Sequence, residues 1–521
     1  MYKSGYGIVR EEVLIFGGAE NAGLLLNTIE TISETAYKVV ALLENDDRFI
    51  GKSVDNIRII PYQNVDVILE SRPVQILLIA KENTDPAIVN FLVEKCLERK
   101  IKIKNIPSPK TWMHGHLSKE QIKEVKIEDL LGRPPIQLFN KQVNELLKGK
   151  RILITGAAGS IGSELAKQVA DMLPDTLILC DQLETGLYSI EYDMQQKIPK
   201  SDNLKIVLCD IKDRHAVEQI FIQYTPQIVF HAAAYKHVPM LESHPSEAVR
   251  NNILGTMVLS ELSEYYGVER FLFVSTDKAI NPSNIMGASK RIAEMYCHAL
   301  HYGYSIFFKN NFSSKIYHLN NTGTNKTKFI TTRFGNVLGS NGSVIPRFQQ
   351  QIENGGPVTV THPEVIRYFM TIREACSLVL EAITMGNGGE VFLFDMGEPV
   401  KILDLAEKMI RLAGHEPGKQ INIQFTGLRP GEKLYEELLN KDEEVLKTHH
   451  QKILINKVQE QDNALFAVRL KELIHLATNN DDTAVVKLMK LIVPEYKSNN
   501  SVYTMYDGTS LPGENSLPSA L

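Results

Sequence analysis

The sequence predicts an α/β protein with two successive units, each a parallel sheet covered by helices. Short runs of β-branched residues alternate with helical stretches, which is typical of parallel α/β folds, and this alternation begins twice. Each beginning is a strand pattern, residues 13–16 and 151–155, that runs directly into a glycine-rich turn, residues 17–23 and 156–162. The chain of 521 residues exceeds one ordinary domain, so two or three domains are expected.

The composition restricts the class of function. Hydrophobic residues make up 43% and charged residues 23% of the chain, as in soluble globular proteins. The net charge of −5, with no long run of Lys or Arg, argues against nucleic acid as a partner. The five Cys are scattered and form no CxxC pair, so we expect reduced thiols, no metal site and a cytoplasmic protein. The sequence has no apolar run that could span a bilayer and no signal peptide, and association with the inner face of a membrane through partners stays open.

The first unit is predicted over residues 1–126 as a smaller domain of the nucleotide-binding type. Its glycine turn is less regular than the second one, and Glu44 would supply an acid at the end of its second strand. A regulatory or structural domain is favoured over a second working nucleotide site, and both remain open. Asp85 followed by Pro86 predicts the start of a helix. The elements expected here are strands at 13–16, 39–43 and 76–80 and a helix at 86–100.

The second unit follows a linker, which the chain breakers at 132–135 predict. Residues 302–328 break both helical and strand periodicity and are expected to form a surface insertion. The last residues are rich in Ser, Asn, Gly and Pro and are expected to be disordered. The predicted order is a linker at 127–150, a main domain at 151–439, a helical extension at 440–497 with one helix at 463–477, and a tail at 498–521. Strands are expected in the main domain at 151–155, 176–180, 205–209, 227–230, 271–275 and 329–333.

The turn at residues 156–162 has the form that binds the pyrophosphate of a dinucleotide. It precedes a helix expected from about Ser160, so its glycines would let the backbone approach phosphates at a helix N-terminus. Asp181, 25 residues after Gly156, ends the next strand, where it would accept a ribose 2′-OH and repel a 2′-phosphate. NAD is therefore favoured over NADP, and Asp210 would either bind the adenine amine or cap a helix. The predicted cofactor-binding residues are Gly156, Gly159, Ser160, Ile161, Gly162, Asp181, Asp210, Ile211, Ala232, Ala233 and Ala234.

Five further motifs follow the glycine turn and carry a family resemblance. They are residues 234–240 (AYKHVPM), 275–278 (STDK), 286–290 (MGASK), 333–340 (RFGNVLGS) and 429–433 (RPGEK). With them the chain resembles the nucleotide-sugar 4,6-dehydratases of the extended short-chain dehydrogenase superfamily. It is most similar to the long bacterial UDP-N-acetylglucosamine 4,6-dehydratases of polysaccharide biosynthesis, of the capsule and bacillosamine type. The resemblance covers residues 127–439 strongly and the first unit loosely.

This resemblance implies a fold, a cofactor and partners. Residues 151–439 would form a catalytic NAD(P)-binding Rossmann domain, preceded by the smaller Rossmann-like domain. NAD is the implied cofactor, which Lys290 would also bind, and UDP-N-acetylglucosamine the implied substrate. The superfamily commonly dimerises through the helix that carries this lysine, so a homodimer or higher homo-oligomer is expected. Long relatives usually begin with transmembrane helices, which this sequence lacks.

The reaction of such enzymes explains the residue types. The cofactor takes a hydride from C4 of the sugar, a base removes the proton from C5, an acid helps the C6 hydroxyl to leave as water, and the hydride returns to C6. The resemblance implies Lys278, with a pKa lowered by desolvation, as the C5 base. It implies Asp277, held protonated in an apolar pocket, as the acid. Thr276 would hydrogen-bond the C4 oxygen, and Lys290 would hold the nicotinamide ribose.

Met286 occupies the position, four residues before Lys290, where the superfamily usually has its catalytic Tyr. The C5-retaining long subgroup also lacks this Tyr, so retention at C5 is expected, with Met286 as an apolar wall of the catalytic site. The group that deprotonates the C4 hydroxyl is either Asp277 or a chain of water molecules. Arginine can bind a diphosphate in a bidentate manner. The predicted substrate-binding residues are Lys236, His237, Asn336, Arg347, Arg367, Arg429 and Glu432.

Two other functions compete with this interpretation. A UDP-sugar 4-epimerase transfers the same hydride at C4 but needs no C5 base, so Lys278 beside Asp277 argues against it. A non-catalytic sensor of nucleotide sugars or NAD would suit the missing Tyr, but the loss of Asp277 and Lys278 would then be expected too. The sequence leaves the downstream glycan pathway open.

Overall fold

The chain divides into two compact units in the structure, which is a computed structural model. The structure describes residues 11–31, 37–80, 85–107, 112, 122–125, 141–198, 203–309, 313–318, 327–437, 445–456 and 462–508. The first unit contains Met1–Ile136, Arg347–Val358 and Asp404–Gln424, and the second contains Gln137–Pro346, Thr359–Leu403 and Phe425–Leu521. Two short segments expected in the main domain thus group with the N-terminal residues. The predicted boundary at residue 126 and the linker up to residue 140 lie outside the described residues.

The first unit contains a twisted sheet whose inner strands are parallel. Its strand order is β3-β4-β2-β1-β5-β6-β7 in the described part of the chain, and β3 and β7 are antiparallel edges. The central strands β1 and β5 contain continuous buried apolar runs, as is typical of a parallel sheet covered on both faces. Asp85 caps α3 by accepting the backbone N–H of Ala87 at 2.9 Å, as predicted. The elements are β1 (Glu11–Phe16), α1 (Ala22–Thr31), β2 (Tyr37–Glu44), β3 (Ser53–Val54), β4 (Ile57–Pro61), α2 (Val65–Ser71), β5 (Ile76–Ile79), α3 (Pro86–Glu98), β6 (Lys102–Asn105) and β7 (Lys123–Glu124).

The second unit contains the larger sheet, with the order β10-β9-β8-β11-β12-β15-β20-β24-β23. The first seven of these strands are parallel, and β24 and β23 are antiparallel. The chain direction across the sheet reverses between β8 and β11, so a crevice is expected at their carboxyl ends. All six strands predicted for this domain are present within one or two residues. Their bounds are β8 (Arg151–Thr155), β9 (Thr176–Asp181), β10 (Leu204–Leu208), β11 (Ile228–His231), β12 (Arg270–Thr276), β15 (Lys328–Phe334), β20 (Val391–Phe394), β23 (Val445–Lys447) and β24 (Ile453–Asn456).

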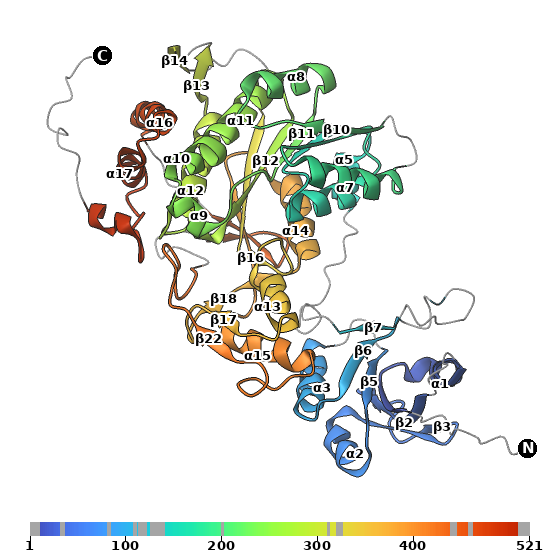
Figure 1. The fold of residues 1–521 in the computed structure, drawn as a ribbon. Coiled ribbons are helices and arrows are strands. Elements are labelled where there is room, and N and C mark those ends of the chain that lie inside the picture. The colour runs from blue at the N-terminus through green and yellow to red at the C-terminus, as the bar shows by residue number, and fades with distance from the viewer. Residues whose placement is uncertain are drawn as a thin grey trace, which may run out of the picture. The chain divides into compact units, whose positions relative to one another are not determined.

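Helices cover both faces of this sheet (Figure 1). On one face α8 (Arg214–Tyr224), α11 (Gly255–Tyr265) and α12 (Ile285–His301) pack side by side, and on the other α6 (Ser160–Ala170) packs on α14 (Ile372–Met385). Part of the predicted linker is helical, since α5 (Lys141–Leu147) packs against α14. The apolar core therefore extends through the sheet, and it fixes the strand ends that form the crevice.

The predicted C-terminal helix is present as α16 (Asn463–Thr478), followed by α17 (Asp482–Ile492). These helices bury apolar side chains such as Leu473 and Met489 in the same core cluster as Tyr296 of α12. The helix that carries Lys290 is therefore covered partly by α17 of the same chain. A homodimer through this helix remains a prediction.

Two segments differ from the sequence prediction. The described part of the insertion is an antiparallel hairpin of β13 (Tyr304–Lys309) and β14 (Ser313–His318), because its aromatic and β-branched residues favour strands even without strict alternation. The disorder predicted from residue 498 is wrong for residues 498–508. Ser498 is buried and Val502–Tyr506 is a short 3₁₀ helix, because the polar side chains here bond to the protein. The rest of that tail lies outside the described residues.

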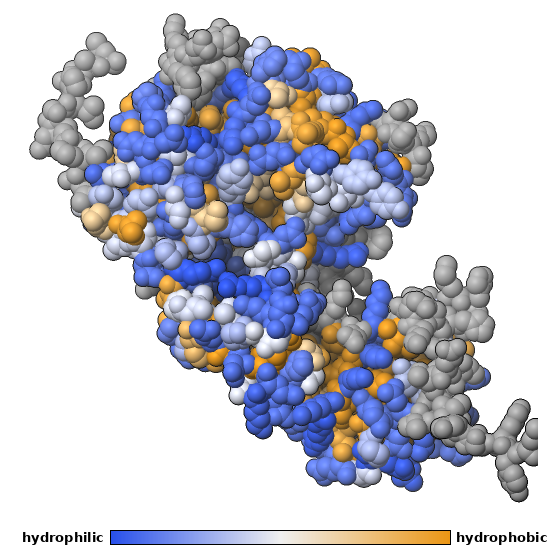
Figure 2. Space-filling view, in the orientation of Figure 1, coloured by the Kyte–Doolittle hydropathy of each residue, from blue (hydrophilic) through white to orange (hydrophobic). Residues whose placement is uncertain are grey.

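The visible surface in Figure 2 is mainly hydrophilic, with apolar side chains scattered in small groups. This agrees with the 23% of charged residues. Among the described residues, no helix has both the length and the apolar character to cross a membrane.

Candidate active site

A cavity of about 750 Å³ lies at the carboxyl ends of β8, β11, β12 and β15, within the second unit. Of the residues predicted for the site, it is lined by Gly156, Gly159, Ser160, Ile161, Gly162, Ala232, Ala234, Lys236, His237, Thr276, Met286 and Lys290. Those predicted residues that lie outside its lining are Asp181, Asp210, Ile211, Ala233, Asp277, Lys278, Asn336, Arg347, Arg367, Arg429 and Glu432. The cavity thus joins the glycine turn to the end of β12, while most of the predicted substrate-binding residues do not line it.

The glycine turn is shaped by close approaches that no side chain would permit. Gly156 has a φ of 71°, and a Cβ there would lie 2.6 Å from the backbone nitrogen of Ala233. A Cβ on Gly162 would lie 2.1 Å from the carbonyl oxygen of Gly156. The first turn of α6 borders the cavity directly after Gly159. This bare backbone at a helix N-terminus fits the pyrophosphate of a dinucleotide.

Asp181 holds the glycine turn in place. One carboxylate oxygen accepts the backbone N–H of Ala158 at 2.9 Å, and the other accepts that of Leu183 at 3.0 Å. Both of these neighbours line the cavity. Each carboxylate oxygen keeps a second lone pair, so the carboxylate can also accept a ribose hydroxyl. The sequence placed this acid correctly at a strand end but gave no sign of its contact with the turn.

Asp210 and Ile211 follow β10, and both make contacts within the protein. Asp210 accepts the backbone N–H of Lys212 at 3.0 Å and pairs with the ammonium of the same lysine at 3.2 Å. The cap of α8 is Asp213 instead. Ile211 is buried, and a Cβ on Gly255 would lie 2.6 Å from its Cδ1. Ile211 thus packs in the core, and Asp213 instead of Asp210 caps α8, while contact of Asp210 with the adenine amine remains a prediction.

The end of β12 carries a buried carboxylate. Asp277 is only 3% exposed, and its Oδ1 accepts the Thr276 hydroxyl at 2.9 Å and the Lys278 ammonium at 3.0 Å. Its Oδ2 is buried and accepts no hydrogen bond from the described residues. A Cβ on Gly335, which lines the cavity, would lie 2.9 Å from this Oδ2. An unsatisfied carboxylate oxygen therefore lies directly behind the cavity wall.

Lys278 is held by several acceptors. Its ammonium lies 3.0 Å from Asp277, 3.3 Å from the Asn336 side-chain oxygen and 3.7 Å from the Glu436 carboxylate. Burial disfavours the ammonium, but the carboxylates of Asp277 and Glu436 outweigh it and raise the pKa of Lys278 above its usual value. The lowered pKa expected from desolvation is therefore wrong, because two acids accompany the lysine. The sequence missed Glu436, whose one signal is its position just after the motif at 429–433.

Lys290 lies in different surroundings. It is buried on α12, and its ammonium lies 3.9 Å from the centre of the Phe273 ring. Burial lowers the pKa of Lys290 to about 7, although Glu294 and Cys297 oppose the shift. Burial, with Lys290 nearby, also lowers the pKa of His231 well below its usual value.

Arg367 and Glu432 organise the motif at 429–433 rather than facing the cavity. The buried Arg367 guanidinium donates to the carbonyls of Lys433 at 2.7 Å and Leu434 at 3.2 Å, and to Glu432 Oε1 at 3.3 Å. Glu432 Oε2 accepts the backbone N–H of Arg429 at 3.1 Å and its Nε at 3.3 Å. Arg429 is half-exposed. These contacts fix the loop and leave Arg429 as its accessible cation.

Arg347 is separate from this network. It is exposed on α13 (Val344–Glu353), in a segment that groups with the first unit. The role predicted for it in substrate binding remains a prediction.

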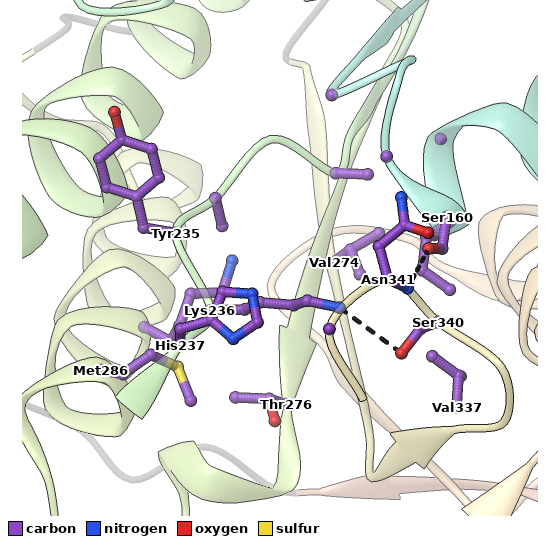
Figure 3. A pocket seen from close by; sticks show the side chains of 18 of the residues that line it. Ser160, Tyr235, Lys236, His237, Val274, Thr276, Met286, Val337, Ser340 and Asn341 are labelled. Atoms are coloured by element: carbon purple, nitrogen blue, oxygen red, sulfur yellow. Dashed lines mark hydrogen bonds between the residues drawn. The ribbon is translucent and has the colours of Figure 1, made fainter. Parts of the chain in front are cut away.

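The Lys236 side chain crosses the cavity (Figure 3). Its ammonium lies 3.5 Å from the Ser340 hydroxyl, and burial lowers its pKa. His237 packs on Gly342, where a Cβ would lie 2.6 Å from the imidazole ring. Burial, Lys236 and Arg429 together lower the pKa of His237. Met286 is 4% exposed and adds an apolar side chain to the same wall.

In the first unit, a side chain occupies the space next to the glycine turn. Gly17 and Gly18 have φ values of 82° and 81°, and a Cβ on Gly18 would lie 2.7 Å from Cδ2 of the buried Leu25. Glu44 is buried and accepts the backbone N–H of Asn45 at 2.9 Å. A leucine side chain thus packs against this turn, which favours the structural or regulatory role predicted for the unit.

The sheet order, the glycine turn and the lysine on α12 define an extended short-chain dehydrogenase fold. The chain belongs to the family described as "Polysaccharide biosynthesis protein", which matches residues 152–458. It is 38% identical over 453 residues to the capsular polysaccharide biosynthesis protein CapD of Staphylococcus aureus, covering 87% of this chain and 72% of CapD. Among solved structures it is similar to Pen from Bacillus thuringiensis, with 31% identity, a TM-score of 0.52, and 59% of this chain and 88% of Pen covered.

Relatives of two enzyme types resemble the second unit. A UDP-glucose 4-epimerase of Rickettsia rickettsii is 31% identical over 297 residues, which cover 56% of this chain and 79% of the epimerase. A UDP-N-acetylglucosamine 4,6-dehydratase (inverting) of Campylobacter jejuni is 29% identical over 300 residues, covering 57% of this chain and 80% of the dehydratase. Similarity alone therefore does not separate the two reactions.

Proposed function

We propose that this protein is a UDP-N-acetylglucosamine 4,6-dehydratase, a hydro-lyase of polysaccharide biosynthesis that retains the configuration at C5. Its broader class, a nucleotide-sugar-modifying enzyme of the short-chain dehydrogenase superfamily, follows from the family and the site. The observation that carries the finer proposal is the ion pair of the buried Asp277 with the partly buried Lys278 behind the cavity wall. A reaction that removes a proton from C5 needs such a pair, and hydride transfer at C4 alone does not.

The cavity has a backbone cradle that suits NAD. Bound there, NAD would accept a hydride from C4 and return it to C6. The first turn of α6, with Ser160 and Ile161, would hold the pyrophosphate. Asp181 would accept the adenosine ribose hydroxyls, and its charge supports NAD over NADP. Lys290, with a pKa of about 7, would hold the nicotinamide ribose.

Thr276 and Asp277 form a path for the proton of the C4 hydroxyl. The Thr276 hydroxyl lines the cavity and donates to Asp277 Oδ1. As C4 is oxidised, the hydroxyl proton would pass through Thr276 to the carboxylate. The protonated Asp277 would then give this proton to the departing C6 hydroxyl, which leaves as water. One carboxylate thus serves both steps, and it returns to its starting charge.

Lys278 would take the C5 proton and give it back to the same face of the sugar. Met286 offers no proton donor on the neighbouring wall, which supports retention at C5. Lys278 acts as a base only when it is neutral. Since its pKa is raised, the reactive fraction at pH 7 is small and the elimination rate would increase with pH.

The second candidate is a UDP-sugar 4-epimerase, which the similarity to the Rickettsia enzyme favours. An epimerase would use the cavity and the C4 hydride in the same way, but it would leave Lys278 without a task. The dehydratase is preferred because three side chains, those of Asp277, Asn336 and Glu436, contact the ammonium of this lysine and hold it in place.

The decisive experiment incubates the protein and NAD with UDP-N-acetylglucosamine in heavy water, followed by mass spectrometry and proton NMR. A dehydratase gives a product that has lost one water, carries deuterium at C5 and forms without net reduction of NAD. The ring coupling constants distinguish retention from inversion at C5. Unchanged mass with a mixture of C4 epimers would establish the epimerase instead.

A further inference from the structure

The C-terminal segment of residues 497–501, called the strap here, is tied to the start of the catalytic helix. The backbone N–H of Lys497 donates to the carbonyl of Pro282 at 3.0 Å, and that of Asn499 donates to the carbonyl of Ser283 at 3.0 Å. These acceptors directly precede α12, which carries Met286 and Lys290. The strap lies beyond residues 152–458, which the family match covers.

The other edge of the strap holds the loop at residues 428–432. The carbonyl of Asn499 accepts the backbone N–H of Gly431 at 2.7 Å. The Asn499 side-chain amide donates to the carbonyl of Glu432 at 2.8 Å, and that of Asn500 donates to the carbonyl of Leu428 at 2.5 Å. Three backbone groups of a five-residue loop are thus satisfied by two neighbouring asparagines.

This loop packs against residues next to the cavity lining. A Cβ on Gly431 would lie 2.6 Å from Cβ of Asn284 and 2.9 Å from Cγ1 of Val238. Asn284 caps α12 and also donates to the carbonyl of Gly431 at 3.0 Å. Arg429 of the loop is close enough to lower the pKa of His237, which lines the cavity. Displacing the loop would therefore move its accessible cation away from the cavity rim.

The strap is anchored independently of the loop. Lys490 of α17 is buried, lies 4.0 Å from the Tyr496 ring, and donates to the Ser498 hydroxyl at 2.8 Å and to the Asp507 carboxylate. Ser501 donates to Glu242 Oε2 at 2.6 Å. Because these anchors do not involve the loop, the two asparagine amides can be changed while the strap stays in place.

We propose that Asn499 and Asn500 are positioning residues that hold the loop at 428–432 for the nucleoside diphosphate end of the substrate. They touch no reacting atom, and they act through Arg429 and Glu432. This inference rests on the proposed function for the identity of the nucleotide and on the substrate-binding role predicted for Arg429 and Glu432. A merely stabilising strap would affect the whole fold, whereas a positioning strap affects the nucleotide subsite selectively.

The test compares Asn499→Ala combined with Asn500→Gly against the full-length parent. Gly is chosen because Asn500 has a φ of 48°, which Gly adopts without strain. Loss of two side-chain hydrogen bonds should weaken calorimetric binding of UDP, and raise KM, by about 5- to 30-fold. The kcat should stay within about twofold, and the affinity for NAD should not change. The control is Asn479→Ala, which removes an exposed side chain whose hydrogen bond, within the described part of the chain, is to His475 at 3.1 Å.

Two results would overturn the proposal. One is UDP affinity and KM equal to those of the parent. The other is a parallel loss of NAD affinity, kcat and melting temperature, which would mean that the strap only stabilises the fold. Should the parent protein form no dehydrated sugar, the proposed function fails, but UDP binding by parent and variant still decides the role of the strap.

Discussion

The site contains two lysines, the partly buried Lys278 at the end of β12 and the buried Lys290 on α12, and their pKa values are shifted in opposite directions. Lys278 lies within 4 Å of two carboxylates and an amide oxygen, and its pKa is raised. Lys290 lies on the face of an aromatic ring, and its pKa falls to about 7. Burial alone therefore does not set the charge of a lysine, because the number of nearby acids decides it.

The acid nearest in sequence to Lys290 explains the difference. Glu294 is one helical turn away, but its carboxylate is bound by Arg333, at 2.8 Å through Nε and 2.6 Å through a terminal nitrogen. Its charge is thus largely neutralised before it reaches Lys290. At the end of β12, the Lys278 ammonium lies 3.0 Å from Asp277 and 3.7 Å from Glu436, and these two carboxylates outweigh the opposing effects of burial and of Arg367, which lies 3.7 Å from Glu436. The surroundings of Lys278 therefore favour its protonated form, whereas Lys290, with a pKa of about 7, is partly protonated at neutral pH.

The largest effect is expected from Lys278→Met. The change leaves the buried Asp277 without its cation and Glu436 with Arg367 alone, which costs about 3–5 kcal/mol of unfolding free energy. Dehydration should fall by at least about 10³-fold, since the C5 base is lost. Because the folded pKa of Lys278 is raised, its stabilisation is present below its unfolded pKa and disappears as pH increases through the folded pKa.

Urea unfolding and the release of the C5 proton to solvent measure the two effects of Lys278→Met. The matched control is Lys150→Met, which removes a surface ammonium 2.7 Å from Glu269 and should cost no more than about 1 kcal/mol. Equal stability of the two variants would mean that the carboxylates near Lys278 do not depend on it.

The second prediction concerns Lys290→Met, which should stabilise the fold, whereas Lys278→Met should destabilise it. Lys290→Met should increase the unfolding free energy at pH 7 by up to about 4 kcal/mol, since the pKa of Lys290 falls from 10.5 to about 7 and each unit of depression corresponds to ~1.4 kcal/mol. The folded pKa of about 7 lies below the usual 10.5, so the lysine destabilises the fold fully below pH 7 and ever less as pH increases toward 10.5. Catalysis should nevertheless fall by about 100-fold.

The pH series of unfolding free energies is the critical measurement for Lys290→Met. The gain over the parent should be larger at pH 6 than at pH 9. A variant that is less stable than the parent at pH 6 would show that the ammonium at Lys290 stabilises the fold, as the one at Lys278 does.

The sequence predicted the surroundings of Lys290 better than those of Lys278. The helix of Lys290 and the strands around the cavity follow from local patterns, namely β-branched runs and the glycine turn. The charge of Lys278 depends on Glu436, 158 residues further along, and the strap reaches the loop across 67 residues between Asn499 and Glu432. No local pattern encodes such contacts, since they arise only when the chain folds. For the same reason Asn499 was predicted to be disordered.

The third prediction alters one acid only. Glu436→Gln removes a carboxylate 3.7 Å from the Lys278 ammonium while keeping the shape of the side chain. The pKa of Lys278 should therefore fall, and the rise of the dehydration rate with pH should move to lower pH. The size of the maximal rate should change by less than about tenfold, because Asp277 and Thr276 stay in place.

A pH–rate profile at saturating substrate measures the shift to lower pH, and an unchanged profile would contradict the role of Lys278 as the C5 base. Glu437→Gln, next in sequence, is the control, since Glu437 pairs with Lys433 at 3.6 Å instead.

The smallest effect is expected from Met286→Tyr, which places a phenol four residues before Lys290. Met286 is 4% exposed, so the larger ring should overpack the wall and cost about 1–3 kcal/mol of unfolding free energy. The rate should decrease by no more than about tenfold, and the product should keep its C5 configuration, because Lys278 both removes and returns that proton.

NMR of the product in heavy water checks the configuration, and Met286→Leu, which nearly conserves volume, separates packing from chemistry. Inversion at C5 in the Tyr variant alone would show that the lysine on α12, acting with a phenol, can deliver the proton from the other face. The apolar side chain of Met286 would then be the feature that prevents Lys290 from taking part in proton transfer at C5.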